Sequence, residues 1–159
     1  MRSLNYKVKL TAVADKFSLE YIYKPKNINE IYVSRADLSR PGLPLAGFFK
    51  HFENERIQLI GNMENGYLEG LSPDERRNAI EQLLQHHIVA LIITTNLPVF
   101  PELLELAEVY NTPVLRTKDA TSAFTAALTS YLNVELAERI TTHGVMVEVY
   151  GEGILILGD

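Results

Sequence analysis

The 159-residue sequence contains no cysteine. This absence excludes disulfide bonds, thiol catalysis and metal sites built on cysteine. The sequence is also short of positive charge, because 15 Lys and Arg residues face 20 Asp and Glu residues and leave a net charge of −5. Nucleic acids and anionic membrane surfaces are therefore not expected as partners.

Long apolar runs are missing as well. None approaches the ~20 residues needed to span a bilayer, and residues 1–13 lack the basic-then-apolar pattern of a signal peptide. We therefore expect a cytoplasmic protein, which the absence of cysteine also fits. No H-E-x-x-H motif or carboxylate cluster is present, so no metal site is expected. Apolar residues make up 47% of the chain, enough for the core of one domain with an appendage.

Short apolar segments alternate between strand and helix spacing. Strands are expected at 19–23, 31–33, 56–60, 88–93 and 113–115. Helices are expected at 10–17, after the Ser72-Pro73 start signal, at 101–110 (with Leu103, Leu104 and Ala107 facing the core) and at 122–132. This alternation predicts an α/β domain over residues 1–133, with a mostly parallel sheet and flanking helices. Residues 134–159 are expected to form a linker helix and a β-hairpin of a second, truncated domain.

The segment 145–159 is similar to the beginning of a phosphate-binding loop. An alternating apolar segment and a glycine turn lead to the apolar run at 154–157, then to Gly158 and Asp159. A P-loop requires a buried strand followed by G-x-x-x-x-G-K-[ST], whose backbone N–H groups hold phosphate. Gly158 fits the first glycine and Asp159 the next position, whereas the second glycine, the lysine and the Ser or Thr are absent. From spacing alone, an edge hairpin is the favoured explanation of this segment, because only half of the motif is present.

Several motifs together resemble the bacterial HPr kinase/phosphorylase family. Residues 139–159 are similar to the beginning of its catalytic domain. Asp-Leu-Ser-Arg-Pro-Gly at 37–42, followed by Leu-Ala-Gly-Phe-Phe at 45–49, resembles the signature of its N-terminal domain. Arg-Ile-Gln-Leu-Ile-Gly at 56–61 and Thr-Pro-Val-Leu-Arg at 112–116 fit the family in order and spacing. The resemblance extends from about residue 13 to residue 159.

The resemblance implies the N-terminal domain of a bifunctional enzyme. Members of the family use ATP and Mg²⁺ to phosphorylate a serine of the phosphocarrier protein HPr, and they remove this phosphate by phosphorolysis in the control of carbon metabolism. The family also implies a homo-oligomer, commonly a hexamer. Gly158 and Asp159 would then begin the nucleotide-binding loop. The present chain alone is expected to be inactive and to hold neither ATP nor Mg²⁺.

His143 is the candidate catalytic residue. It lies between a predicted helix and a predicted strand, immediately before Gly144. From the sequence alone it is either a loop histidine bonded to a carbonyl group or a group that transfers protons or pairs with phosphate oxygens near neutral pH. The resemblance implies the second role, because the position matches the active-site histidine of the family.

Asp37, Ser39 and Arg40 form a second candidate site. A short polar loop after a strand can hold an anion, with Arg40 as a bidentate donor. The same residues equally suit a turn in which Asp and Ser bond their own backbone. The stretch is also faintly similar to the N-terminal domain of muramyl ligases, where a uridine nucleotide binds. The alternative function is therefore a stand-alone module that binds a small anionic metabolite or nucleotide at residues 37–47.

The remaining histidines and a phenylalanine cluster favour structural roles. His86 and His87 are adjacent and face different directions, so we expect them to cap a helix C-terminus and not to share a metal. Phe48, Phe49 and Phe52 are expected in a core or in a contact between subunits.

Overall fold

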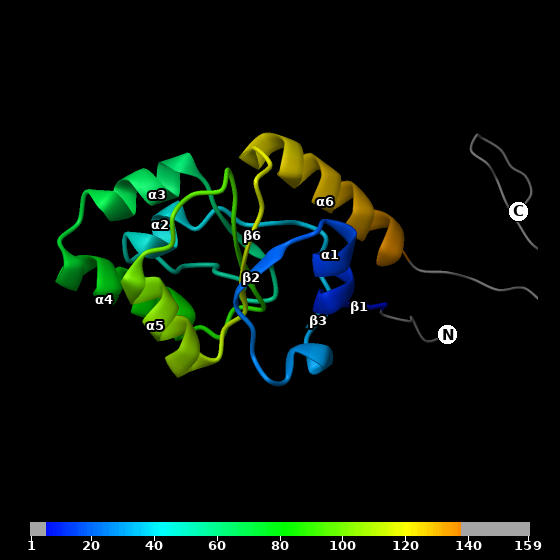
Figure 1. Ribbon diagram of the computed structural model, residues 1–159, viewed down its shortest axis with the longest axis horizontal. Coiled ribbons are helices and arrows are strands. Elements are labelled where there is room, and N and C mark those ends of the chain that lie inside the picture. The colour runs from blue at the N-terminus through cyan, green and yellow to red at the C-terminus, as the bar shows by residue number, and fades with distance from the viewer. Residues whose placement is uncertain (1–5, 138–159) are drawn as a thin grey trace, which may run out of the picture.

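The computed structural model describes residues 6–137, and Figure 1 shows their arrangement. Along the chain the elements are β1 Val8–Lys9, α1 Leu10–Lys16, β2 Glu20–Tyr23, a 3₁₀ helix Ile28–Glu30, β3 Tyr32–Val33, α2 Gly42–Leu45, β4 Gln58–Ile60, α3 Asn62–Glu69, α4 Pro73–Leu84, β5 Leu91–Ile93, α5 Pro101–Tyr110, β6 Val114–Arg116 and α6 Thr121–Glu135. The five predicted strands and the helices at 10–17, after Ser72 and at 101–110 are thereby confirmed.

The main sheet has four strands in the order β2-β6-β5-β4. Strands β4, β5 and β6 are parallel, whereas β2 runs antiparallel to β6. The predicted α/β class with a mostly parallel sheet is therefore confirmed. Strands β1 and β3 form a separate antiparallel pair.

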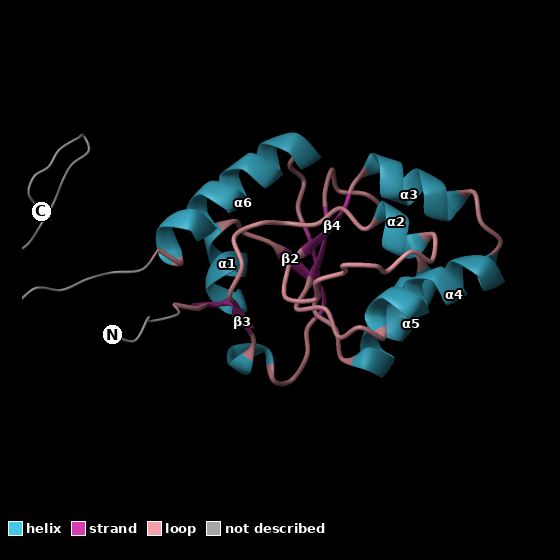
Figure 2. Cartoon of the chain, turned by 180° about the vertical axis from the view of Figure 1, so that it is seen from behind, coloured by secondary structure: helices cyan, strands magenta, loops and turns pink. Residues whose placement is uncertain are grey.

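Helices cover both faces of the main sheet. Figures 1 and 2 show α1 and α6 on one side of the strands and α2, α3, α4 and α5 on the other. Alternate residues of each strand enter the two cores, because side chains in a strand point to opposite faces. In β5, for example, Ile92 packs with α1 and α6, whereas Leu91 and Ile93 pack with α3, α4 and α5. The fully apolar strand β5 is explained by this double coverage.

Helix α4 begins as its sequence predicts. Pro73 occupies the first turn, and the Ser72 hydroxyl accepts a hydrogen bond from the Glu75 N–H at 3.2 Å. The Glu75 carboxylate accepts a reciprocal bond from the Ser72 N–H at 3.0 Å. This capping box satisfies two of the N–H groups that a helix start leaves without intrahelical partners.

Three features differ from the sequence prediction. In α5 Leu104 is 46% exposed, and Leu106 at 1% takes the inward position beside Leu103 and Ala107. Helix α3 was not predicted, because Gly61 and Gly66 are typical of a loop. Helix α6 continues to Glu135, three residues beyond the predicted end at 132.

Within residues 6–137, no helix combines the length and hydrophobicity needed to cross a membrane.

Candidate functional site

The structure places Asp37 in a network with arginines. Arg35 donates to both carboxylate oxygens of Asp37, at 2.9 Å and 2.6 Å, and also to Glu53 at 3.3 Å. Arg56 lies 3.4 Å from the same carboxylate. The hydrogen bonds from Arg35 hold the pKa of the Asp37 carboxyl below its usual value. Asp37 therefore ties its loop to the segment around residues 53–56.

Ser39 contributes through its backbone. Its N–H donates to the Ile57 carbonyl at 2.9 Å, and its carbonyl accepts from the Leu59 N–H at 2.8 Å. These bonds form an isolated parallel bridge to β4. The loop is thereby fixed along the edge of the main sheet.

Arg40 pairs with Glu64, just beyond the end of β4, and not with Asp37. Its Nε and Nη2 atoms donate to the two oxygens of Glu64 at 3.0 Å and 2.9 Å, which is a bidentate pair. The Glu64 side chain is only 7% exposed, whereas that of Arg40 is 42% exposed. The same carboxylate accepts the Gly61 N–H at 2.8 Å and so caps the start of α3. Glu64 therefore neutralises Arg40 and holds the helix in place.

Sequence reasoning did not identify Glu64. The available signal was its position three residues after Gly61, because a Glu at this spacing often caps the residue that precedes a helix. That signal becomes visible only once α3 is recognised as a helix.

The first turns of α3 and α6 meet at the carboxyl edge of the parallel strands. The Thr94 hydroxyl, directly after β5, lies 2.5 Å from the Thr121 hydroxyl at the start of α6. A Cβ atom at Gly61 would lie 2.6 Å from the Thr121 hydroxyl and 2.9 Å from Arg40 Nη2, so only glycine fits between them. Open α/β sheets bind ligands at this edge of their strands. The edge is therefore the candidate functional region of the domain.

The predicted capping by His86 is confirmed. Its Nδ1 atom lies 2.8 Å from the Gln82 carbonyl, just beyond the end of α4. The ring stacks on Phe49 with centroids 4.1 Å apart, and Phe52 meets both rings edge-on. Phe48 is exposed and remains outside this cluster. Among residues 6–137 no group of three His, Asp or Glu side chains could hold a metal ion.

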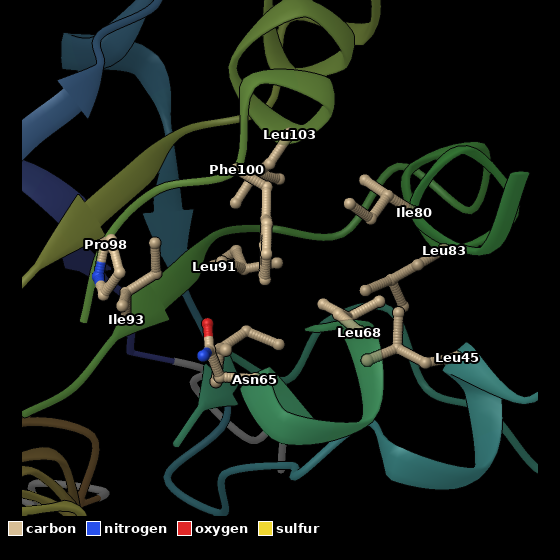
Figure 3. A pocket seen from close by; sticks show the side chains of 11 residues that line it. Leu45, Asn65, Leu68, Ile80, Leu83, Leu91, Ile93, Pro98, Phe100 and Leu103 are labelled. Atoms are coloured by element: carbon tan, nitrogen blue, oxygen red, sulfur yellow. The ribbon is translucent and has the colours of Figure 1, made fainter. Parts of the chain in front are cut away.

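An apolar pocket lies between the main sheet and helices α2 to α5. Figure 3 shows the amide of Asn65 pointing into it among Leu, Ile and Phe side chains. The cavity measures about 10 Å³, which holds about one water molecule. It is therefore a packing defect of the core and is too small for a metabolite.

His143, Gly158 and Asp159 lie outside the described residues. The structure consequently does not place the predicted catalytic histidine or the beginning of the predicted phosphate-binding loop.

The fold and this polar edge define an α/β domain with one mixed sheet between two helical layers. The chain belongs to the HPr kinase N-terminal family, because the family model "HPr Serine kinase N terminus" matches residues 8–132. It is 43% identical to the HPr kinase/phosphorylase of Caldicellulosiruptor bescii over 92% of this chain and 47% of that protein. The enzyme of the same name from Bacillus licheniformis is 41% identical over 96% of this chain and 49% of its own length.

The chain spans about half the length of the curated relatives it matches. A solved structure with a similar fold contains the CBS and DRTGG domains of the regulatory region of Clostridium perfringens pyrophosphatase, in complex with diadenosine tetraphosphate. The TM-score is 0.56 over 85% of this chain and 53% of that one, with 14% identity. This likeness shows the fold alone.

Proposed function

We propose that this chain is the N-terminal domain of a bifunctional HPr kinase/phosphorylase. The parent enzyme would use ATP and Mg²⁺ to phosphorylate a serine of HPr, and it would remove that phosphate by phosphorolysis. The observation that carries the proposal is an identity of 36–43% to enzymes of this name, which extends over 92–97% of the chain. The parent would act in the cytoplasm as a homo-oligomer that regulates carbon metabolism.

The proposal divides the work between two halves of the parent. The described residues would form a domain that positions or regulates the catalytic half. His143 would transfer a proton or pair with phosphate oxygens there. Gly158 and Asp159 would begin the loop that holds the phosphates of ATP.

A chimera tests this proposal. In it the present chain replaces the matching part of the Caldicellulosiruptor bescii relative, and the intact relative serves as control. With ATP, Mg²⁺ and HPr, we expect phosphoserine on HPr by mass spectrometry. With phosphorylated HPr and inorganic phosphate, we expect loss of the phosphoserine and formation of pyrophosphate. A folded chimera with neither activity would contradict the proposal.

The side-chain pairing in the loop at residues 37–47 disfavours an anion site there. Asp37 and Arg40 are both paired with side chains of this chain. An anion at Arg40 would have to displace the buried carboxylate of Glu64, which also caps α3.

A further inference from the structure

A polar cleft lies at the other end of the same sheet edge, where β6 ends beside the start of β2. Its volume is about 280 Å³. The residues that line this cleft and could contact a ligand include Phe17, Ser18, Glu20, Asn96, Arg116 and Lys118. None of them belongs to the Arg40–Glu64 pair or to the apolar pocket.

Asn96, which lines the cleft, and the preceding Thr95 have unusual backbone conformations. Thr95 and Asn96 have positive φ angles of 59° and 51°, a region that β-branched residues such as Thr rarely adopt. Two hydrogen bonds of 2.8 Å hold them there, from the Thr95 N–H to the Asp119 carbonyl and from the Asn96 N–H to the Thr117 carbonyl. The loop after β5 is thereby fastened to the loop after β6. Strained residues held in this way are concentrated at functional sites.

Arg116 is fixed in the cleft but not saturated. Its Nε and Nη2 atoms donate to Glu20 at 3.0 Å and 3.2 Å, and its Nη1 atom donates to the Leu97 carbonyl at 3.0 Å. A guanidinium group has five N–H bonds, so two remain for a further acceptor. Because its protein partners already orient it, little conformational entropy is lost when an anion binds.

Other polar side chains of the cleft have no protein partner. Among residues 6–137, none forms a hydrogen bond or ion pair with the side chains of Ser18, Asn96 or Lys118. Two carboxylates also line the cleft. Glu20 forms an ion pair with Arg116, and Asp119 is exposed to solvent. The groups without a partner are therefore a hydroxyl and an amide, which can each donate and accept hydrogen bonds, and the ammonium group of Lys118.

We propose that this cleft binds a compact metabolite with one anionic group. The ammonium of Lys118 and the free N–H bonds of Arg116 contact the anionic oxygens. Asn96 and Ser18 bond the polar part of the molecule, and Phe17 lies against its carbon atoms. The volume of about 280 Å³ lies just below the ~300–1,000 Å³ typical of small-molecule sites, which suits a compact ligand. The position agrees with the rule that ligands bind beyond the carboxyl ends of parallel strands.

Nuclear magnetic resonance on the ¹⁵N-labelled 159-residue chain tests this proposal. The probes are inorganic phosphate and glycolate, each titrated against sodium chloride of equal ionic strength. We expect saturable shifts of the Asn96, Thr117 and Lys118 amides with at least one probe. Saturation with phosphate alone identifies a phosphorylated ligand, and saturation with glycolate alone identifies a carboxylate.

Two lysine variants provide the comparison. Lys118→Gln should weaken binding about tenfold, since it removes a charged hydrogen bond. Lys26→Gln, in the turn beyond the far end of β2, should leave binding unchanged. Shifts that only match the chloride blank would overturn the proposal, as would equal binding by the wild type and a folded Lys118→Gln variant. The outcome is independent of kinase activity, which the chimera measures separately.

Discussion

At the scale of single residues, Gly61 decides how closely α3 and α6 approach each other. Its φ of −111° is open to any residue, so the demand for glycine comes from space. A Cβ atom would meet Thr121 at 2.6 Å. A Cβ atom at Gly66, within α3, would meet nothing within 4 Å. Gly61, directly before α3, is therefore constrained by packing, whereas Gly66, within α3, is not.

We predict opposite effects of alanine at these two positions. Gly61→Ala should lower the free energy of unfolding by about 1–3 kcal/mol through overpacking. Gly66→Ala should raise it by about 0.5–1 kcal/mol, because glycine is unfavourable inside a helix. Urea denaturation of the 159-residue chain measures both variants. Changes of the same sign in the two variants would contradict the packing described at the sheet edge.

His143 carries the second residue-scale prediction. In the chimera, His143→Ala should reduce both kinase and phosphorylase rates by about 10²–10⁴-fold, the usual contribution of a group that transfers protons. The melting temperature should stay close to that of the unsubstituted chimera, because His143 is not part of an apolar stripe in the sequence. Both quantities are measured on one purified variant. Near-normal rates, or a rate loss that accompanies unfolding, would remove His143 from the active site.

At the scale of elements, the sequence of α5 does not determine which face of the helix is buried. Five of its ten residues, Leu103, Leu104, Leu106, Ala107 and Val109, are apolar aliphatic side chains. The 3.6-residue period therefore allows more than one inward face. Contact with α4 and the main sheet selects the face with Leu103, Leu106 and Ala107.

A pair of substitutions on α5 measures this orientation. Leu106→Ala should cost about 2–5 kcal/mol of stability, as expected when a buried leucine is truncated. Leu104→Ala, with the same chemistry two residues earlier, should stay within about 0.5 kcal/mol of wild type. Chemical denaturation followed by circular dichroism gives both values. A larger loss of unfolding free energy for Leu104→Ala than for Leu106→Ala would favour the buried face that the sequence predicted.

At the scale of the whole molecule, the proposal places the catalytic chemistry outside the domain that the structure describes. We predict that the 159-residue chain alone does not phosphorylate HPr. Its sequence contains no G-K-[ST], so it lacks the lysine that contacts the β- and γ-phosphates and the hydroxyl that binds Mg²⁺. The assay is incubation with ATP, Mg²⁺ and HPr, followed by mass spectrometry. Phosphoserine above a control without the chain would refute the prediction.

The sequence by itself determined the alternation of strands and helices, the start of α4 and the α/β class. These features follow from local patterns, since apolar periodicity and caps involve residues a few positions apart. The motifs at 37–49, 56–61 and 112–116 also indicated the family, which the matching family model confirms.

Only the tertiary structure decided the rest. The antiparallel direction of β2 was not predictable, because a period of two specifies which residues face the core but not the direction of pairing. Arg40 and Glu64, which form a hydrogen bond, are 24 residues apart in the sequence. Arg116 and Glu20, which also form one, are 96 residues apart. Such partners depend on the path of the whole chain. The sequence therefore offered Arg40 as a bidentate donor to an anion or as part of a turn, and it did not indicate Glu64 as its partner. It also did not indicate the cleft around Arg116 and Lys118.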